Sequence, residues 1–129
     1  MRLRVGLLFV IPILTGCVSM IQSLGEAAGY YSISYVRTEL VPEREVIPAF
    51  RQFANAEHFT CGPVVNQLTV ILSCSRAGGI HLNVFRETGR IKFISEMPYG
   101  VVDTNAFKTL NARLAKFLRD RFKDAAGSS

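Results

Sequence analysis

The sequence predicts an α+β domain of two layers, in which a helix is followed by a three-stranded antiparallel meander and then by a second helix. Two segments, 43–59 and 104–123, repeat apolar residues at spacings of three and four, which is typical of amphipathic helices. Between them, apolar and polar residues alternate in three short segments separated by turns that contain glycine. Both helices are expected to cover one face of the resulting sheet.

The first helix is expected over Glu43 to Phe59. Its apolar side chains fall on one helical face: Val46, Phe50, Phe53 and Ala54. Pro48 fits best in a first helical turn, so either the helix begins near Ile47 or a short turn after Pro42 is interrupted there. The run Cys61-Gly62-Pro63 then ends the pattern.

The three central segments predict two consecutive hairpins. The first strand covers 67–75, and Ala77-Gly78-Gly79 turns the chain into a second strand. Glu87-Thr88-Gly89 suits a three-residue hairpin loop that leads into a third strand, Arg90 to Met97. In one register, the sheet face away from the helices is mixed and partly available to partners, and it carries Thr69, Ile71, His81, Asn83, Phe85, Lys92 and Ile94.

The second helix is expected over Thr104 to Lys123. Its apolar stripe consists of Phe107, Leu110, Leu114, Phe117, Leu118 and Phe122. Basic residues near its end complement the helix dipole. We interpret the polar face that continues through Arg113 and Lys116 as solvated, in preference to a site for an anionic ligand. The last residues, Ala125 to Ser129, are expected to fray.

Two further segments concern recognition. Tyr30 to Val36 is rich in aromatic and β-branched residues, so it either adds an edge strand or presents its tyrosines to a membrane interface or a partner. The loop 96–102 is the main candidate for partner recognition, because it combines apolar residues with Pro and Gly. The candidate partner-binding residues are Tyr99, Met97 and Phe85, whereas Val101 and Val102 are expected to lie in a buried crossover.

The start of the chain has the pattern of an export signal. A basic Met1-Arg2-Leu3-Arg4 precedes an apolar run, Val5 to Leu14, and the run ends at Leu14-Thr15-Gly16-Cys17. The apolar run is about ten residues long, whereas a helix needs roughly 20 to cross a bilayer. A cleaved signal peptide is therefore expected rather than a transmembrane helix.

The ending Leu14-Thr15-Gly16-Cys17 resembles the lipobox of bacterial lipoproteins, although an ordinary signal peptidase site after Gly16 is the alternative. The resemblance covers these residues and the signal alone. It implies a diacylglyceryl thioether and acyl chains such as palmitate on Cys17. Val18 at the next position resembles lipoproteins that are passed to the outer membrane, with the domain facing the periplasm.

These boundaries divide the chain into four parts: a signal peptide (1–16), a lipidated N-terminus and tether (17–42), one α+β domain (43–124) and a frayed tail (125–129). The formal charge of +5 falls by two when Arg2 and Arg4 leave with the signal. The remaining basic residues are spread along the chain, which argues against a nucleic-acid partner.

With Cys17 assigned to lipid, Cys61 and Cys74 remain as a pair in a compartment where disulfides persist. They enclose a loop of about a dozen residues, and we expect a structural disulfide rather than a redox or metal pair. No metal and no other cofactor is expected.

No catalytic motif occurs, and His58 and His81 each stand alone in their segments. The leading hypothesis is therefore a protein without enzymatic activity, anchored in the outer membrane by its lipid, that binds or helps to assemble another envelope protein. Alternatives are an immunity-type inhibitor of a periplasmic enzyme toxin, and a small lipid or ligand carrier. A carrier would require a concave apolar pocket.

Overall fold

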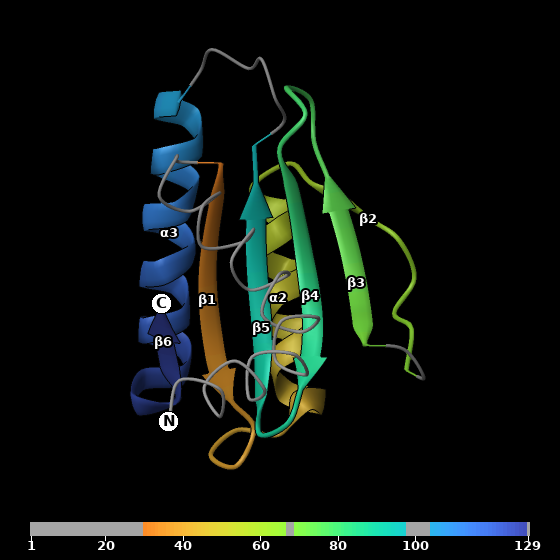
Figure 1. Ribbon diagram of the computed structural model, residues 1–129, viewed down its shortest axis with the longest axis vertical. Coiled ribbons are helices and arrows are strands. Elements are labelled where there is room, and N and C mark those ends of the chain that lie inside the picture. The colour runs from red at the N-terminus through yellow and green to blue at the C-terminus, as the bar shows by residue number, and fades with distance from the viewer. Residues whose placement is uncertain (1–29, 67–68, 98–103, 129) are drawn as a thin grey trace, which may run out of the picture.

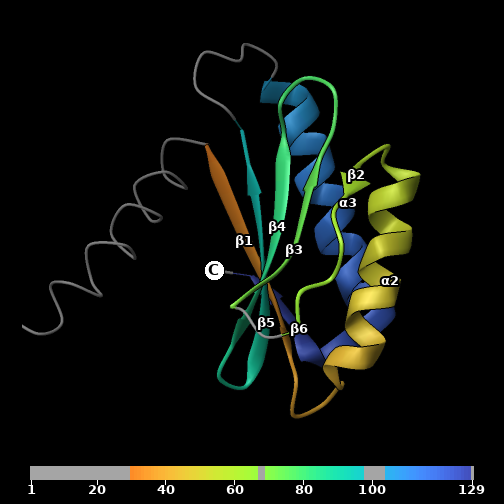
Figure 2. The same cartoon turned by 90° about the vertical axis from the view of Figure 1, so that its right-hand side faces the viewer.

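The computed structural model describes residues 30–66, 69–97 and 104–128 (Figure 1). Its elements are β1 (Tyr31–Arg37), α2 (Glu43–Ala56), β2 (Thr60–Cys61), β3 (Val70–Ser75), β4 (His81–Glu87), β5 (Arg90–Glu96), α3 (Thr104–Phe122), a 3₁₀ turn (Lys123–Ala125) and β6 (Ala126–Ser128). The described strands form one antiparallel sheet of six strands, in the order β2-β3-β4-β5-β1-β6. Both helices lie on the same side of this sheet (Figure 2). The predicted α+β class is confirmed.

The sheet is larger than the predicted meander, because both ends of the domain contribute strands. The meander is present as β3-β4-β5, and β1 pairs with β5 over its whole length, from Tyr31 opposite Glu96 to Arg37 opposite Arg90. The Tyr30 to Val36 segment therefore forms a strand, and that strand lies inside the sheet rather than at its edge. Since β1 belongs to the sheet, the folded domain begins before the predicted boundary at Glu43 and includes Tyr31–Arg37.

The expectation of a frayed tail is wrong. Ala125 is only 3% exposed, and Ala126–Ser128 forms β6, which pairs with Ser34 to Val36. Without β6, these central residues of β1 would present unpaired backbone groups at a sheet edge. The short strand therefore protects that edge.

Helix α2 begins at Glu43, as the predicted range has it, and continues through Pro48, so neither the alternative start near Ile47 nor an interruption at the proline occurs. Proline is tolerated here because it lies early in the helix and is exposed, so that water can reach the backbone carbonyl that its ring leaves without a donor. Glu43 and Glu45 occupy the first turn, where negative charge complements the helix dipole.

The helix ends earlier than the sequence predicts, at Ala56. His58 adopts a left-handed backbone with φ of 65°. Its N–H donates to the Asn55 carbonyl, and the Phe59 N–H donates to the Ala54 carbonyl at 2.8 Å. These two bonds form a Schellman motif, which satisfies the last carbonyls of the helix and turns the chain toward β2.

The main core lies between the helices and the sheet. The Phe50 and Phe93 rings join α2 to β5 with centroids 5.0 Å apart, and Phe53 and Phe117 join the two helices at the same distance. Helix α3 buries Phe107, Leu110, Leu114, Leu118 and Phe122, as its periodicity predicts.

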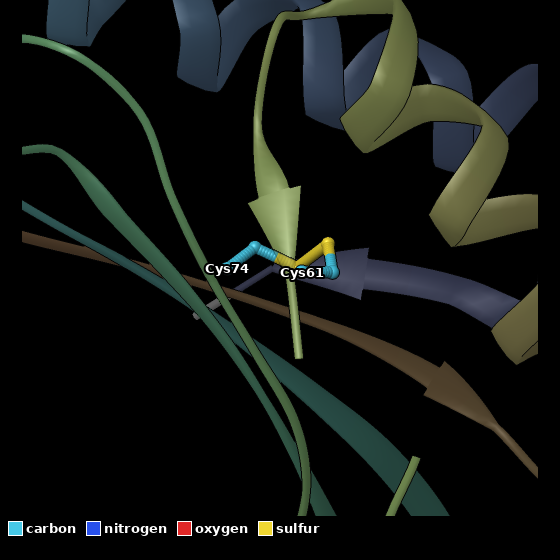
Figure 3. The surroundings of a disulfide bond; sticks show 2 residues. All are labelled: Cys61 and Cys74. Atoms are coloured by element: carbon cyan, nitrogen blue, oxygen red, sulfur yellow. A yellow bond between two sulfur atoms is a disulfide. The ribbon is translucent and has the colours of Figure 1, made fainter. Parts of the chain in front are cut away.

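The disulfide between Cys61 and Cys74 is present, as predicted (Figure 3). The two residues are direct partners of β2 and β3, with their Cα atoms 4.0 Å apart. The bond therefore holds the short strand that follows α2 against the sheet.

Candidate interaction surface

The sheet face opposite the helices, here called the outer face, is the candidate site. Residues directly opposite each other on paired strands project to the same face, so the pairing identifies its members. They are Tyr31, Ile33, Tyr35, Arg37, Thr60, Val70, Ser73, Ser75, His81, Asn83, Phe85, Glu87, Arg90, Lys92, Ile94 and Glu96. Neither described helix covers this face (Figure 2).

The centre of the outer face is apolar and its surroundings are mixed. Ile33 and Ile94 are partners across β1 and β5 and are both buried. Val70 at the start of β3 is 38% exposed, and its partner Phe85 is half-buried. Because Ile33 and Ile94 are buried, the apolar surface open to a partner is that of Val70 and Phe85, which lie among polar residues as is typical of a protein-binding surface.

Charged side chains hold the aromatic rings of the outer face in place around one carboxylate. Glu87 accepts a hydrogen bond from Arg90 Nε at 2.7 Å and pairs with Lys92 Nζ at 2.8 Å. The Arg90 guanidinium lies 3.9 Å from the centroid of the Tyr35 ring, and Lys92 Nζ lies 5.4 Å from that of Phe85. Such cation–π contacts stabilise the observed side-chain positions. The rings are thus ordered before any partner binds.

The pKa of the Glu87 carboxyl reflects this network. Partial burial raises the pKa, but the hydrogen bonds from Lys92 and Arg90 oppose that effect and exceed it, so the pKa lies below its ordinary value. The carboxylate therefore stays ionised and keeps both cations at the outer face.

A second ion pair connects the two layers. Arg86 of β4 donates from Nε and Nη2 to the two carboxylate oxygens of Glu43, at 2.7 and 2.8 Å. Its Nη1 donates to the Asn66 carbonyl at 3.0 Å. The hydrogen bond from Arg86 lowers the pKa of Glu43, although burial opposes this. The pair fixes the start of α2 to the sheet.

These lowered pKa values predict a loss of stability in acid. As the pH falls toward the ordinary glutamate value, the unfolded chain takes up protons before the folded chain does, so the free energy of unfolding decreases. Glu43→Gln should reduce the loss of unfolding free energy between pH 7 and pH 3 by an amount of the order of 1 kcal/mol. The effect is modest because the pair with Arg86 is partly exposed. Urea unfolding between pH 7 and pH 3 measures it.

Glu39→Gln is the matched control, because Glu39 is exposed and belongs to neither pair. This variant should keep the pH dependence of the unmodified protein. An unchanged pH dependence in Glu43→Gln would contradict the assignment of the acid effect to the Arg86 pair.

The structure separates the predicted partner-binding residues. Phe85 lies on the outer face. Met97 is only 5% exposed, so its expected exposure is wrong. Met97 lies on the same face of the strand as Ile91, Phe93 and Ser95, which is the face covered by the helices. Its N–H donates to the Tyr30 carbonyl at 2.8 Å. Tyr99 lies outside the described residues, as do Val101, Val102 and Cys17.

The predicted membership of the outer face is correct for His81, Asn83, Phe85, Lys92 and Ile94. It is wrong for Ile71, which is fully buried in the main core. The pairing of β3 with β4 is irregular between Val70 and Leu72, so strict alternation fails there and Val70 faces outward instead. Strand irregularities of this kind leave no clear signal in a single sequence.

Within residues 30–66, 69–97 and 104–128, no cluster of three His, Cys, Asp or Glu side chains could hold a metal ion. None of the helices in this part of the chain is long and apolar enough to cross a membrane. His58 and His81 are both exposed, one at the end of α2 and the other on the outer face.

The fold and the outer face define a small α+β domain with one sheet face covered by helices and a second face rich in aromatic and charged residues. Comparison of the chain with models of protein families, with curated proteins and with solved structures finds no match. Its function is therefore inferred from its own residues.

Proposed function

We propose that this protein is a lipoprotein of the outer membrane that binds another envelope protein in the periplasm and has no enzymatic activity. The observation that carries the proposal is the ordered set of aromatic and basic side chains on the outer face. Aromatic residues and arginine are the types that contribute most binding energy at protein interfaces. Tyr35, Phe85 and Arg90 provide them here, next to the exposed Val70.

The ordering of these side chains favours binding. A flexible surface loses conformational entropy when it is immobilised by a partner, whereas a surface already held in place loses less. Glu87 holds Arg90 and Lys92, and these in turn lie against the rings of Tyr35 and Phe85. The outer face is therefore suited to a specific partner rather than to transient contacts.

The anchor is supported by the lipobox Leu14-Thr15-Gly16-Cys17. One acyl chain binds a membrane only weakly, whereas two or more give stable anchoring. An anchored protein meets its partners at the membrane surface, which suits an accessory role in an envelope assembly.

Site-specific photocrosslinking in cells tests this proposal. A photoreactive residue at Val70 should give one discrete adduct with an envelope protein, whereas the same probe at Gln52, exposed on α2, should not. Phe85→Ala should lower the yield of the Val70 adduct about tenfold, as expected for a residue central to an interface. Arg51→Ala, a change on the exposed side of α2, is the matched control and should leave the yield unchanged.

The identity of the adduct separates the proposal from its alternatives. A structural or assembly protein of the envelope supports it, and an enzyme toxin supports the immunity hypothesis instead. Absence of any adduct at Val70, together with lipid that copurifies in stoichiometric amount, would indicate a carrier and overturn the proposal.

A further inference from the structure

The exposed side of α3 and the 3₁₀ turn that follows it carry four cations, here called the basic stripe: Lys108, Lys116, Arg119 and Lys123. At 100° per residue, the three that belong to the helix fall within an arc of about 80°. Leu110, Leu114 and Leu118 occupy the opposite side and are buried against the sheet. Lys108 and Lys116 therefore lie on the side of α3 away from the sheet, whereas Arg119 lies at the β6 edge, where it lines a shallow hollow with Ser34 and Gly127.

Part of this positive charge has no ion-pair partner in the described residues. Lys116 Nζ lies 3.3 Å from Asp120, which is the only acidic residue in α3. Lys108, Arg119 and Lys123 have no ion-pair partner among residues 30–66, 69–97 and 104–128. The helix dipole favours cations near the C-terminus of α3, but it offers nothing to Lys108 in the second turn.

The outer face and the helical side of the domain therefore differ in how much positive charge is left without an ion-pair partner. On the outer face, Arg90 and Lys92 share the carboxylate of Glu87, so their charge is partly neutralised. On the helical side, the basic stripe is exposed to solvent, and the Lys116 side chain is 74% exposed. A partner with a broad negative surface would match the helical side and not the outer face.

We propose that the basic stripe lies against anionic phospholipid headgroups of the membrane that carries the Cys17 anchor, in place of the solvated face that the sequence alone favours at Lys116. This inference rests on the lipid anchor of the proposed function. Each Lys or Arg near an anionic bilayer favours the docked state by roughly fivefold, which is weak alone but effective once an anchor holds the protein at the surface. Docking through α3 directs the outer face toward the periplasm, where a protein partner can reach it.

Lysine acylation of the complete lipidated protein tests the inference. The protein is reconstituted on vesicles of phosphatidylcholine, with or without roughly one third phosphatidylglycerol, and treated with a membrane-impermeant acylating reagent. Phosphatidylglycerol should slow acylation of Lys108, Lys116 and Lys123 by about threefold or more. About 0.5 M salt should restore it, because salt screens the attraction. Lys92, which lies on the outer face, is only 12% exposed and is paired with Glu87, should react slowly and at the same rate on both kinds of vesicle.

Two variants of equal net charge show whether the position of the cations matters. Lys108→Gln with Arg119→Gln removes two positive charges from the basic stripe and should abolish the protection of Lys116. Ser73→Glu with Ser75→Glu lowers the net charge by the same amount at exposed positions of the outer face, and should keep the protection. Equal loss in both variants would indicate an effect of net charge and overturn the inference.

The remaining outcomes separate the anchor from the basic stripe. The mass of the N-terminal peptide reports whether Cys17 carries acyl chains, and a free thiol overturns the anchor together with this inference. Acyl chains combined with equal lysine acylation on both kinds of vesicle overturn the inference alone. Protection in cells but not on anionic vesicles indicates an acidic protein on the basic stripe, which also overturns it.

Discussion

Replacement of Phe93 by alanine is expected to lower the free energy of unfolding by about 3–5 kcal/mol. Phe93 is fully buried in β5, with Ser34 of β1 and Val84 of β4 as its neighbours across the strands. Its ring packs on Phe50 of α2 at 5.0 Å, so it joins the sheet to the helical layer. Truncation removes this contact and leaves a cavity that surrounding strands and helix cannot fill.

Urea unfolding of the oxidised protein measures this effect, and Phe85→Ala is the matched control. Phe85 has the same ring but is half-buried on the outer face, so its removal should cost clearly less than the removal of Phe93. The double variant with Phe50→Ala should show a coupling of about 0.5–1.5 kcal/mol between the two rings. Equal losses for Phe85 and Phe93 would contradict the assignment of the core to the helical side.

Reduction of the Cys61–Cys74 disulfide is expected to lower the free energy of unfolding by about 3 kcal/mol. In the chain-entropy model, the bond closes a loop in the unfolded chain and so restricts its conformations. It also keeps β2 on β3, where Cys61 lies opposite Cys74. Loss of the bond therefore frees the connection that follows α2.

The comparison of oxidised and reduced protein in urea measures this, with mass spectrometry under non-reducing conditions to count thiols. Cys61→Ala with Cys74→Ala should match the reduced protein, since both lack the bond. If oxidised, reduced and double-alanine proteins unfold at the same urea concentration, the disulfide does not contribute to stability.

The helices could be predicted well, because their patterns are local. The periodicity of 104–123 closely predicts α3, which spans Thr104–Phe122. The start of α2 was harder to predict, because whether a proline can lie inside a helix depends on whether water reaches the carbonyl it leaves free. Pro48 is exposed, and α2 therefore begins at Glu43. The disulfide was also predicted without the tertiary structure, because two cysteines remain once Cys17 is assigned to lipid in a chain that is expected to be exported.

The strands at the two ends of the domain were predicted only in part, because their pairing joins distant parts of the chain. An edge strand at Tyr30 to Val36 was one of two alternatives, whereas Ala125 to Ser129 was expected to fray. Tyr31–Arg37 acquires its place in the sheet from β5, and Ala126–Ser128 becomes a strand only beside Ser34 to Val36. Ala126–Ser128 has little intrinsic preference for a strand, because it is short and contains a glycine. It is extended because it pairs with the otherwise open edge of β1.

The outer face shows the same division between local and distant information. Alternation along β4 and β5 placed Phe85 and Lys92 correctly, since successive residues of a strand point to opposite faces. Tertiary structure alone brought Tyr35 from β1 beside Arg90, and it also turned Ile71 into the core through an irregularity of β3. Local periodicity therefore specified the elements and the chemical character of their faces. Pairing between distant strands decided which side chains meet, because the free energy of those contacts exists only once the sheet has formed.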